Sequence, residues 1–307
     1  MSTTNSEPTG SFRGLHSKPT GSFRGLHSDG RAAGYSAGKT LPYLTELRRQ
    51  FGRRRTQFAV GFLALLPVIL AIAFAVGGST ADSDTGGLIE LGTRGGVNFT
   101  VFALFMSVGF LLIVVVALFF GDSIASEASW SSLRYLLAIP VPRTRLLLQK
   151  ALVSATLSLA AIVVLVLVSL GIGTVLYGAE SLVTPFGDGL SYMDAVGRLV
   201  IAVGYIAVNL LWVAGLALLL SVLTDAPLGA VGGAVMTSIL MQILDQITAL
   251  GSLRNYLPGH YANSWIDALS PTISWNDMVV GSFSALAYAA VFGVVAWQRF
   301  STKDITS

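Results

Sequence analysis

Six long stretches almost free of charge dominate the sequence and limit what it can fold into. They cover residues 58–76, 97–120, 151–177, 199–223, 228–250 and 278–298. Each is long enough for the roughly 20 apolar residues that an α-helix needs to cross the hydrocarbon of a bilayer. Only 11% of the 307 residues are charged and 53% are hydrophobic, which leaves too little polar surface to keep six such helices in a soluble protein. The sequence therefore predicts an all-α polytopic membrane protein with six transmembrane helices.

The basic residues predict the orientation of these helices. If the N-terminus is cytoplasmic, sixteen of the 19 Lys and Arg residues fall in cytoplasmic segments, and only Arg94, Arg198 and Arg254 fall outside. Because Lys and Arg are retained on the cytoplasmic side, we expect both termini to be cytoplasmic.

The residues before the first span divide into two parts. Residues 1–40 are polar and contain a direct repeat, 8–17 and 19–28. Two copies cannot bury a core, so the sequence predicts a disordered tail, with a docking motif for a partner as the alternative. Residues 58–300 then form the predicted six-span domain, and 301–307 a cytoplasmic C-terminus.

Residues 41–57 predict a basic amphipathic helix lying in the membrane interface. Leu41, Leu44, Leu47 and Phe51 recur at helical spacing, and we expect them to lie opposite Arg48. The alternative is an ordinary basic anchor at the cytoplasmic end of the first span.

The residue inventory excludes several kinds of chemistry. The chain has no cysteine and three histidines, none of them inside a predicted span. Thiolate metal sites, disulfides and intramembrane proteolysis by a histidine-dependent site are therefore not expected. We predict no metal, no cofactor and no catalytic site on this chain.

The most informative loop, residues 122–150, follows the second span. It keeps Trp130, Leu133, Leu136 and Leu137 at helical spacing among polar residues, breaks at Pro140 and Pro142, and returns to the membrane behind basic residues. This pattern predicts a short helix presented to a cytoplasmic partner. The alternative is an amphipathic helix that rests on the bilayer surface.

Three segments resemble the membrane permeases of the second type of ATP-binding-cassette exporter. Residues 122–150 combine an acidic residue, small residues, Leu-x-x-Leu-Leu, Pro-Val-Pro-Arg and a Leu-rich run ending in Lys, which is similar to the coupling segment of that family. Residues 221–230 resemble its second cytoplasmic loop, and residues 297–305 resemble the ending of the drug-resistance and nitrous-oxide-operon branch. One departure is Ser131-Ser132, where family members often have Gly-Thr.

The resemblance implies a function and partners. It implies the substrate-conducting subunit of an exporter for drugs or lipids in a bacterial plasma membrane, with no enzyme activity of its own. A separate cytoplasmic ATPase subunit would bind ATP and Mg, and a second permease copy, identical or related, would complete the path; membrane lipids are expected partners and nucleic acid is not. The residues expected to contact the ATPase are Glu127, Trp130, Leu133, Arg134, Arg143 and Asp225.

Polar residues inside the spans predict the substrate path. Ser238, Gln242 and Asp245 share one face of the fifth span, and Asn209 lies in the fourth. Such residues line a wet path or form hydrogen bonds between helices, and both readings remain open. Asp245 also supports an alternative function, a proton-coupled secondary transporter, although the sequence shows no inverted repeats with broken helices. Residues 251–277 are rich in aromatic residues and predict short helices at the outer membrane surface.

Overall fold

The computed structural model describes residues 42–77, 90–129, 142–183 and 189–302. The chain divides into two units, Met1–Lys39 and Thr40–Ser307, and all the described residues belong to the second. The repeated tail, the expected partner contacts Trp130, Leu133 and Arg134, and residues 303–307 lie outside the described residues.

The described residues are almost entirely helical. The α-helices are α1 (Tyr43–Phe51), α2 (Arg54–Gly77), α4 (Gly96–Val108), α5 (Leu111–Ser129), α7 (Arg143–Tyr177), α8 (Tyr192–Asn209), α9 (Leu211–Leu223), α10 (Pro227–Gln246) and α11 (Trp275–Thr302). Two 3₁₀ segments, η2 (Thr248–Tyr256) and η3 (Ser264–Leu269), occupy the predicted aromatic segment and confirm its short helices. Among the residues that the structure describes, the exception to the all-α prediction is a short antiparallel pair, β1 (Leu182–Val183) and β2 (Gly189–Leu190).

Within the described parts of the chain, six helical segments are long and apolar enough to cross a membrane, and they confirm the six predicted spans. They are Arg54–Val76, Leu111–Ser129, Arg143–Tyr177, Tyr192–Leu223, Pro227–Gln246 and Trp275–Thr302. In α2, α10 and α11 only 17% of the most apolar window is buried inside the protein. A surface this apolar requires lipid around it, so the chain is a polytopic membrane protein.

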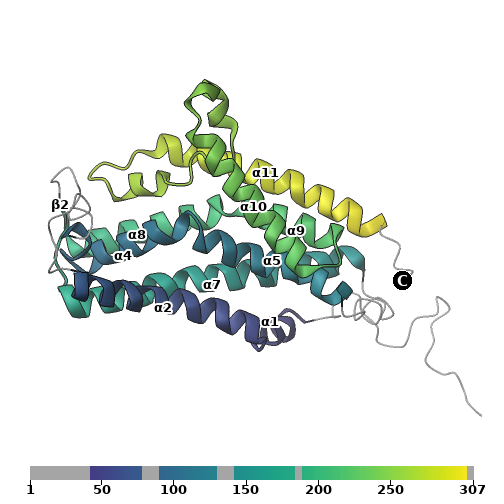
Figure 1. The fold of residues 1–307 in the computed structure, drawn as a ribbon, viewed down its shortest axis with the longest axis horizontal. Helices are drawn as coiled ribbons and strands as arrows, with labels where there is room; N and C mark the ends of the chain where they lie inside the picture. The colour runs from purple at the N-terminus through teal and green to yellow at the C-terminus, as the bar shows by residue number, and fades with distance from the viewer. Residues whose placement is uncertain (1–41, 78–89, 130–141, 184–188, 303–307) are drawn as a thin grey trace, which may run out of the picture. The chain divides into compact units, whose positions relative to one another are not determined.

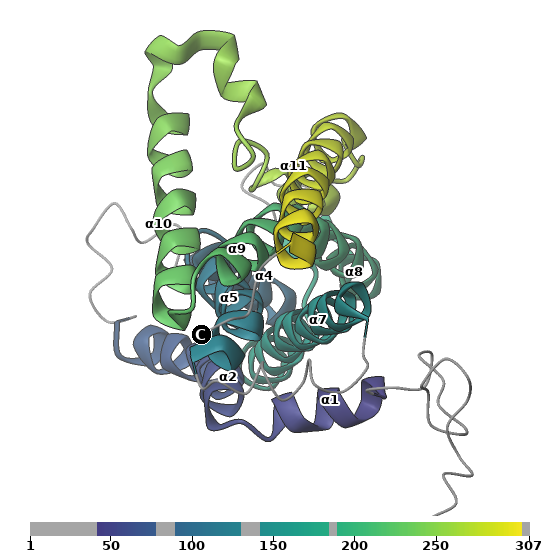
Figure 2. The ribbon, with the colours of Figure 1, turned by 90° about the vertical axis from the view of Figure 1, so that its right-hand side faces the viewer.

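The helices run between two ends that we name by what lies there (Figure 1). The α1 end holds α1, the end of α5, the start of α7, the α9–α10 turn and the end of α11. The hairpin end holds β1 and β2 with the start of α4 and of α8. Figure 2 looks along the spans and shows α1 running across them, whereas α10 leans away from the other helices toward η2.

The second and fourth spans are interrupted, which the sequence did not predict. The regular α-helix is interrupted at Gly109 and Phe110 between α4 and α5, and at Leu210 between α8 and α9. Leu210 still donates to the carbonyl oxygen of Ile206 and accepts from the backbone nitrogen of Ala214, at 3.0 Å each. Gly109 and Leu210 keep helical dihedral angles, with φ/ψ of −69°/−25° and −70°/−6°. The chain therefore continues in a helical direction across both breaks.

Glycine allows two of the spans to cross at close range. A Cβ atom on Gly173 of α7 would lie 2.8 Å from the carbonyl oxygen of Gly96, at the start of α4. A Cβ atom on Gly96 would in turn lie 2.7 Å from the backbone nitrogen of Thr174. Because these contacts involve backbone atoms that cannot rotate away, the α4–α7 crossing requires glycine on both helices.

Candidate functional site

Seven charged side chains meet at the α1 end, where four elements come together. We call them the charge cluster: Glu46 and Arg49 of α1, Arg53 and Arg55 beside the start of α2, Asp122 and Glu127 of α5, and Lys150 of α7. Charged groups at this depth need partners, because transfer of an unpaired ion out of water costs several kcal/mol. The cluster provides those partners across elements far apart in the sequence.

The inner part of the cluster surrounds Lys150. Its Nζ lies 2.8 Å from Oε1 of Glu46 and also pairs with Oε1 of Glu127. The three side chains are only 1–2% exposed. Arg49 reaches the same two carboxylates from the surface side, at 2.9 Å from Glu46 and 2.5 Å from Glu127. One ammonium and one guanidinium therefore neutralise two buried carboxylates.

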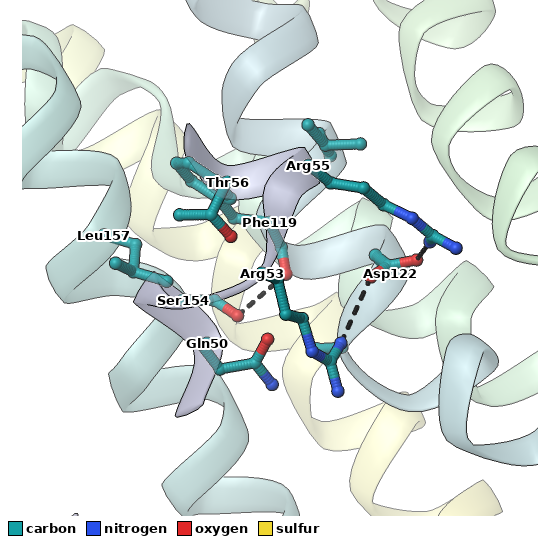
Figure 3. Close-up of a pocket in the computed structure, with 10 residues that line it drawn as sticks. Gln50, Arg53, Arg55, Thr56, Phe119, Asp122, Ser154 and Leu157 are labelled. Atoms are coloured by element: carbon teal, nitrogen blue, oxygen red, sulfur yellow. Dashed lines mark hydrogen bonds and ion pairs between the residues drawn. The ribbon is translucent and has the colours of Figure 1, made fainter. Parts of the chain in front are cut away.

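The outer part of the cluster is centred on Asp122. Arg55 lies 2.5 Å and Arg53 3.4 Å from its two carboxylate oxygens, and Figure 3 shows both guanidinium groups directed toward it. The three side chains line a cavity of about 20 Å³ between α2, α5 and α7, which is room for one water molecule. The hydroxyl of Ser154 closes another side by donating to the carbonyl oxygen of Phe119 at 2.8 Å.

The electrostatics hold Glu46 in its ionised form. Burial alone raises the pKa of this carboxyl group, but hydrogen bonds from Arg49, Lys150 and Gln50 and the charge on Lys150 outweigh it and lower the pKa to about 2. For Arg49, burial lowers the pKa, but the hydrogen bond and charge of Glu46 and the charge of Glu127 outweigh it and raise the pKa. The α1 side of the cluster therefore remains ionised over the physiological pH range.

Two members of the charge cluster flank residues 130–141, the middle of the predicted coupling segment. Glu127 lies two residues before the end of α5, Lys150 lies seven residues after the start of α7, and the two side chains form an ion pair. An ion pair therefore joins α5 and α7, the helices before and after residues 130–141. Glu46 of α1 pairs with the same Lys150. A displacement of one of these helices acts on the other two.

This arrangement corrects the prediction for Glu127. We expected this residue to contact a partner protein, but it is 2% exposed and its carboxylate faces Lys150 and Arg49. Arg143 instead lies at the surface and donates from Nη1 to the carbonyl oxygen of Ser301, 3.0 Å away at the end of α11. Asp225 lies exposed in the turn between α9 and α10, at the α1 end.

The four residues predicted to line a substrate path have separate surroundings in the described structure. Ser238 is fully buried and donates to the carbonyl oxygen of Ala234 in its own helix, 2.9 Å away. Asn209 is 4% exposed, next to the break at Leu210. Gln242 donates from Nε2 to the carbonyl oxygen of Gly109, 2.8 Å away. This hydrogen bond connects α10 to the break between α4 and α5.

Asp245 lies at the end of α10. It is the penultimate residue of α10, which ends at Gln246, so it does not sit well within a span. Its Oδ1 lies 2.5 Å from Nδ1 of His260 and 3.6 Å from Nε of Arg254. The carboxylate therefore connects the end of α10 to the segment that contains η2.

Sequence reasoning missed Glu46, Asp122 and Lys150 as members of a site. One signal was available, because Lys150 interrupts an apolar run at the start of a long helix and a cation in that position needs a partner. The identity of the partners depends on how α1 folds back on α7, which spacing along the chain does not reveal.

Comparisons with known proteins identify the family. No curated protein matches the chain. A family model described as "Protein of unknown function (DUF2705)" matches residues 86–306. The match covers α4 to α11, and it includes the carboxylates Asp122 and Glu127 of the charge cluster. Because the match covers more than half of the 307 residues, the chain belongs to the DUF2705 family.

Proposed function

We propose that the chain is the permease subunit of an ATP-binding-cassette exporter, driven by a separate cytoplasmic ATPase subunit. The observation that carries the proposal is the ion pair between Glu127 and Lys150 at the base of residues 130–141. A segment that receives force from a partner must be fixed to the spans it moves. Here its two ends are joined to each other and to α1.

The mechanism follows from these connections. When the ATPase subunits close on ATP, they displace the segment, and the charge cluster transmits that displacement to α5 and α7 together. α5 packs against α9 and α10, and the hydroxyl of Ser221 on α9 accepts from the backbone N–H groups of Ile124 and Ala125 at 3.0 Å each. The displacement therefore reaches the fourth span through a polar contact as well as through apolar packing.

An apolar groove gives a candidate path for cargo. It has a volume of about 230 Å³ and lies between α5, α7 and the two sides of the Leu210 break. Its lining is apolar except for the hydroxyl of Ser158. Such a groove suits a drug-like or lipid-like molecule of apolar character. In this proposal a second permease copy completes the path in a bacterial plasma membrane.

We expect a neighbouring reading frame to encode an ATP-binding-cassette ATPase, and the test reconstitutes that ATPase with the full chain in proteoliposomes. We expect the ATPase rate to depend on the permease and Leu133→Asp to abolish that dependence, because an acid in the apolar face of the predicted coupling helix prevents docking. The control Asn276→Asp places the same acid at the start of α11, at the opposite end, and should leave the rate unchanged. Equal rates with and without the permease would contradict the proposal.

A second candidate, a proton-coupled secondary transporter, is favoured by two observations. Asp245 contacts His260, a pair able to exchange a proton, and two spans are interrupted as in many secondary transporters. Against it, both breaks keep helical dihedral angles and Asp245 lies at a helix end. Collapse of the proton gradient at constant ATP separates the two, because it abolishes transport only by the proton-coupled carrier.

A further inference from the structure

The five arginines between residues 48 and 55 fall into two groups. Arg49, Arg53 and Arg55 each pair with a carboxylate of the charge cluster. Arg48 and Arg54 are exposed and form no ion pair with any of the residues that the structure describes. Their charges are therefore not compensated by a carboxylate of the described residues.

Large apolar side chains accompany these two arginines. Leu44 is 74%, Phe51 56% and Phe58 75% exposed. Leu44, Arg48 and Phe51 are spaced i, i+4 and i+7, so they form one stripe of α1, and the prediction that Arg48 lies opposite the apolar residues is wrong. We name Leu44, Arg48, Phe51, Arg54 and Phe58 the elbow surface.

The opposite stripe of α1 carries the buried groups. Glu46 is 3% exposed and pairs with Lys150 of α7, and Gln50, four residues later on the same stripe, is half-buried. The helix thus turns a carboxylate toward the protein and leucine and phenylalanine away from it, the reverse of a helix on a soluble protein. Such an exposed face is stable only when it lies against another apolar phase or a partner.

The direction of α1 identifies that phase. α1 runs across the spans and is joined to α2 by a short turn at Gly52 (Figure 2). The elbow surface therefore lies at the depth where the first span leaves the hydrocarbon and lipid headgroups begin. At this depth an apolar side chain meets acyl chains and an arginine meets phosphate.

We propose that the elbow surface binds anionic phospholipids. The guanidinium groups of Arg48 and Arg54 present forked N–H donors that match the oxygens of a phosphodiester. The net negative charge of the headgroup complements two cations that no carboxylate of the described residues neutralises. Leu44, Phe51 and Phe58 pack against the acyl chains beside the headgroup. An acidic protein surface would satisfy the arginines but would leave three large apolar side chains facing water, so lipid is the better match.

The test measures thermal unfolding of the full chain in a neutral detergent while dioleoylphosphatidylglycerol or dioleoylphosphatidylcholine is added. We expect the anionic lipid to raise Tm in a saturable manner at concentrations where the zwitterionic lipid has little effect. Arg48→Gln and Arg54→Gln should each weaken the apparent affinity for phosphatidylglycerol about fivefold. Without lipid their Tm should equal that of the parent chain, because neither arginine has a partner to lose within the described residues.

The matched control is Arg299→Gln. Arg299 is exposed near the end of α11, at the α1 end, so the substitution removes the same charge away from the elbow surface. We expect it to retain the parent affinity. The proposal is overturned if both lipids raise Tm equally, or if all three variants weaken binding to the same extent. It is also overturned if Arg48→Gln retains lipid affinity but loses binding to the ATPase subunit, because the surface would then be a protein interface.

Discussion

Lys150 of α7 and Glu46 of α1 are separated by 104 residues, yet their charged atoms lie 2.8 Å apart and both side chains are almost completely buried. The ammonium group also pairs with Glu127, so a single cation contacts carboxylates on two different helices. Its removal leaves α1 and α5 with buried negative charge, and Arg49 alone remains to face both.

The first prediction concerns this cation. Lys150→Met should destabilise the protein by about 3–5 kcal/mol, because breaking a buried ion pair leaves an uncompensated charge. Reversible unfolding in detergent measures the loss. The matched control is Arg94→Gln, whose ion pair with Glu90 is exposed at 51% and 67% and should contribute less than about 1 kcal/mol.

A double variant tests whether the loss comes from the uncompensated charge. Lys150→Met combined with Glu127→Leu removes the ammonium together with one of its two carboxylates, so it should be more stable than the sum of the two single losses predicts. Strictly additive losses would show that the two residues are not energetically coupled, and the cluster could not then join α5 to α7.

The second prediction is a pH dependence that originates at Glu46. Its pKa is lowered to about 2 in the folded protein from an ordinary value of 4.5, so its ionisation stabilises the fold above pH 4.5 and that contribution is lost as the pH falls from 4.5 toward 2. Over this window Tm should fall less in Glu46→Gln than in the parent chain. Glu90→Gln, at an exposed position, should follow the parent; identical slopes for all three proteins would refute the assignment.

The sequence predicts some parts of this molecule well for physical reasons. Spans are set by the length of uncharged apolar runs, a property of each segment alone, and α1 likewise follows from local helical spacing. The charge cluster depends on tertiary contacts between α1, α5 and α7. The end of α10 at Gln246 is not marked in the sequence, because the apolar run continues to Leu250 without a helix-breaking residue.

The break at Gly109 is a second feature that the sequence does not predict. Gly109 is followed by Phe110 and a run of apolar residues, and no proline marks the site. The freed carbonyl oxygen of Gly109 accepts from Gln242, which lies 133 residues later. Gln242 was singled out from sequence as a polar residue inside a span, but its partner is a backbone atom that carries no sequence signal.

The third prediction concerns the close crossing of α4 and α7. Gly173→Ala should destabilise the protein by about 1–3 kcal/mol, because the added methyl group would lie 2.8 Å from the carbonyl oxygen of Gly96 and the helices would have to separate. Gly171→Ala on the same helix has nothing within 4 Å and should be neutral or slightly stabilising. Thermal unfolding of both variants in detergent checks the difference, and equal Tm values would mean that the helices do not pack this closely.

The fourth prediction is the orientation of the chain. The sequence has no cysteine, so a single introduced thiol reports its own side of the membrane. Ser129→Cys lies at the end of α5 and Ser252→Cys in η2, and both positions are exposed. In intact cells a membrane-impermeant maleimide should label Ser252→Cys at once and Ser129→Cys only after permeabilisation, because basic residues gather at the α1 end and are retained in the cytoplasm. The reverse pattern would place residues 130–141 outside the cell, where a cytoplasmic ATPase cannot reach them, and the ATP-driven proposal would then fail even if the charge cluster is correct.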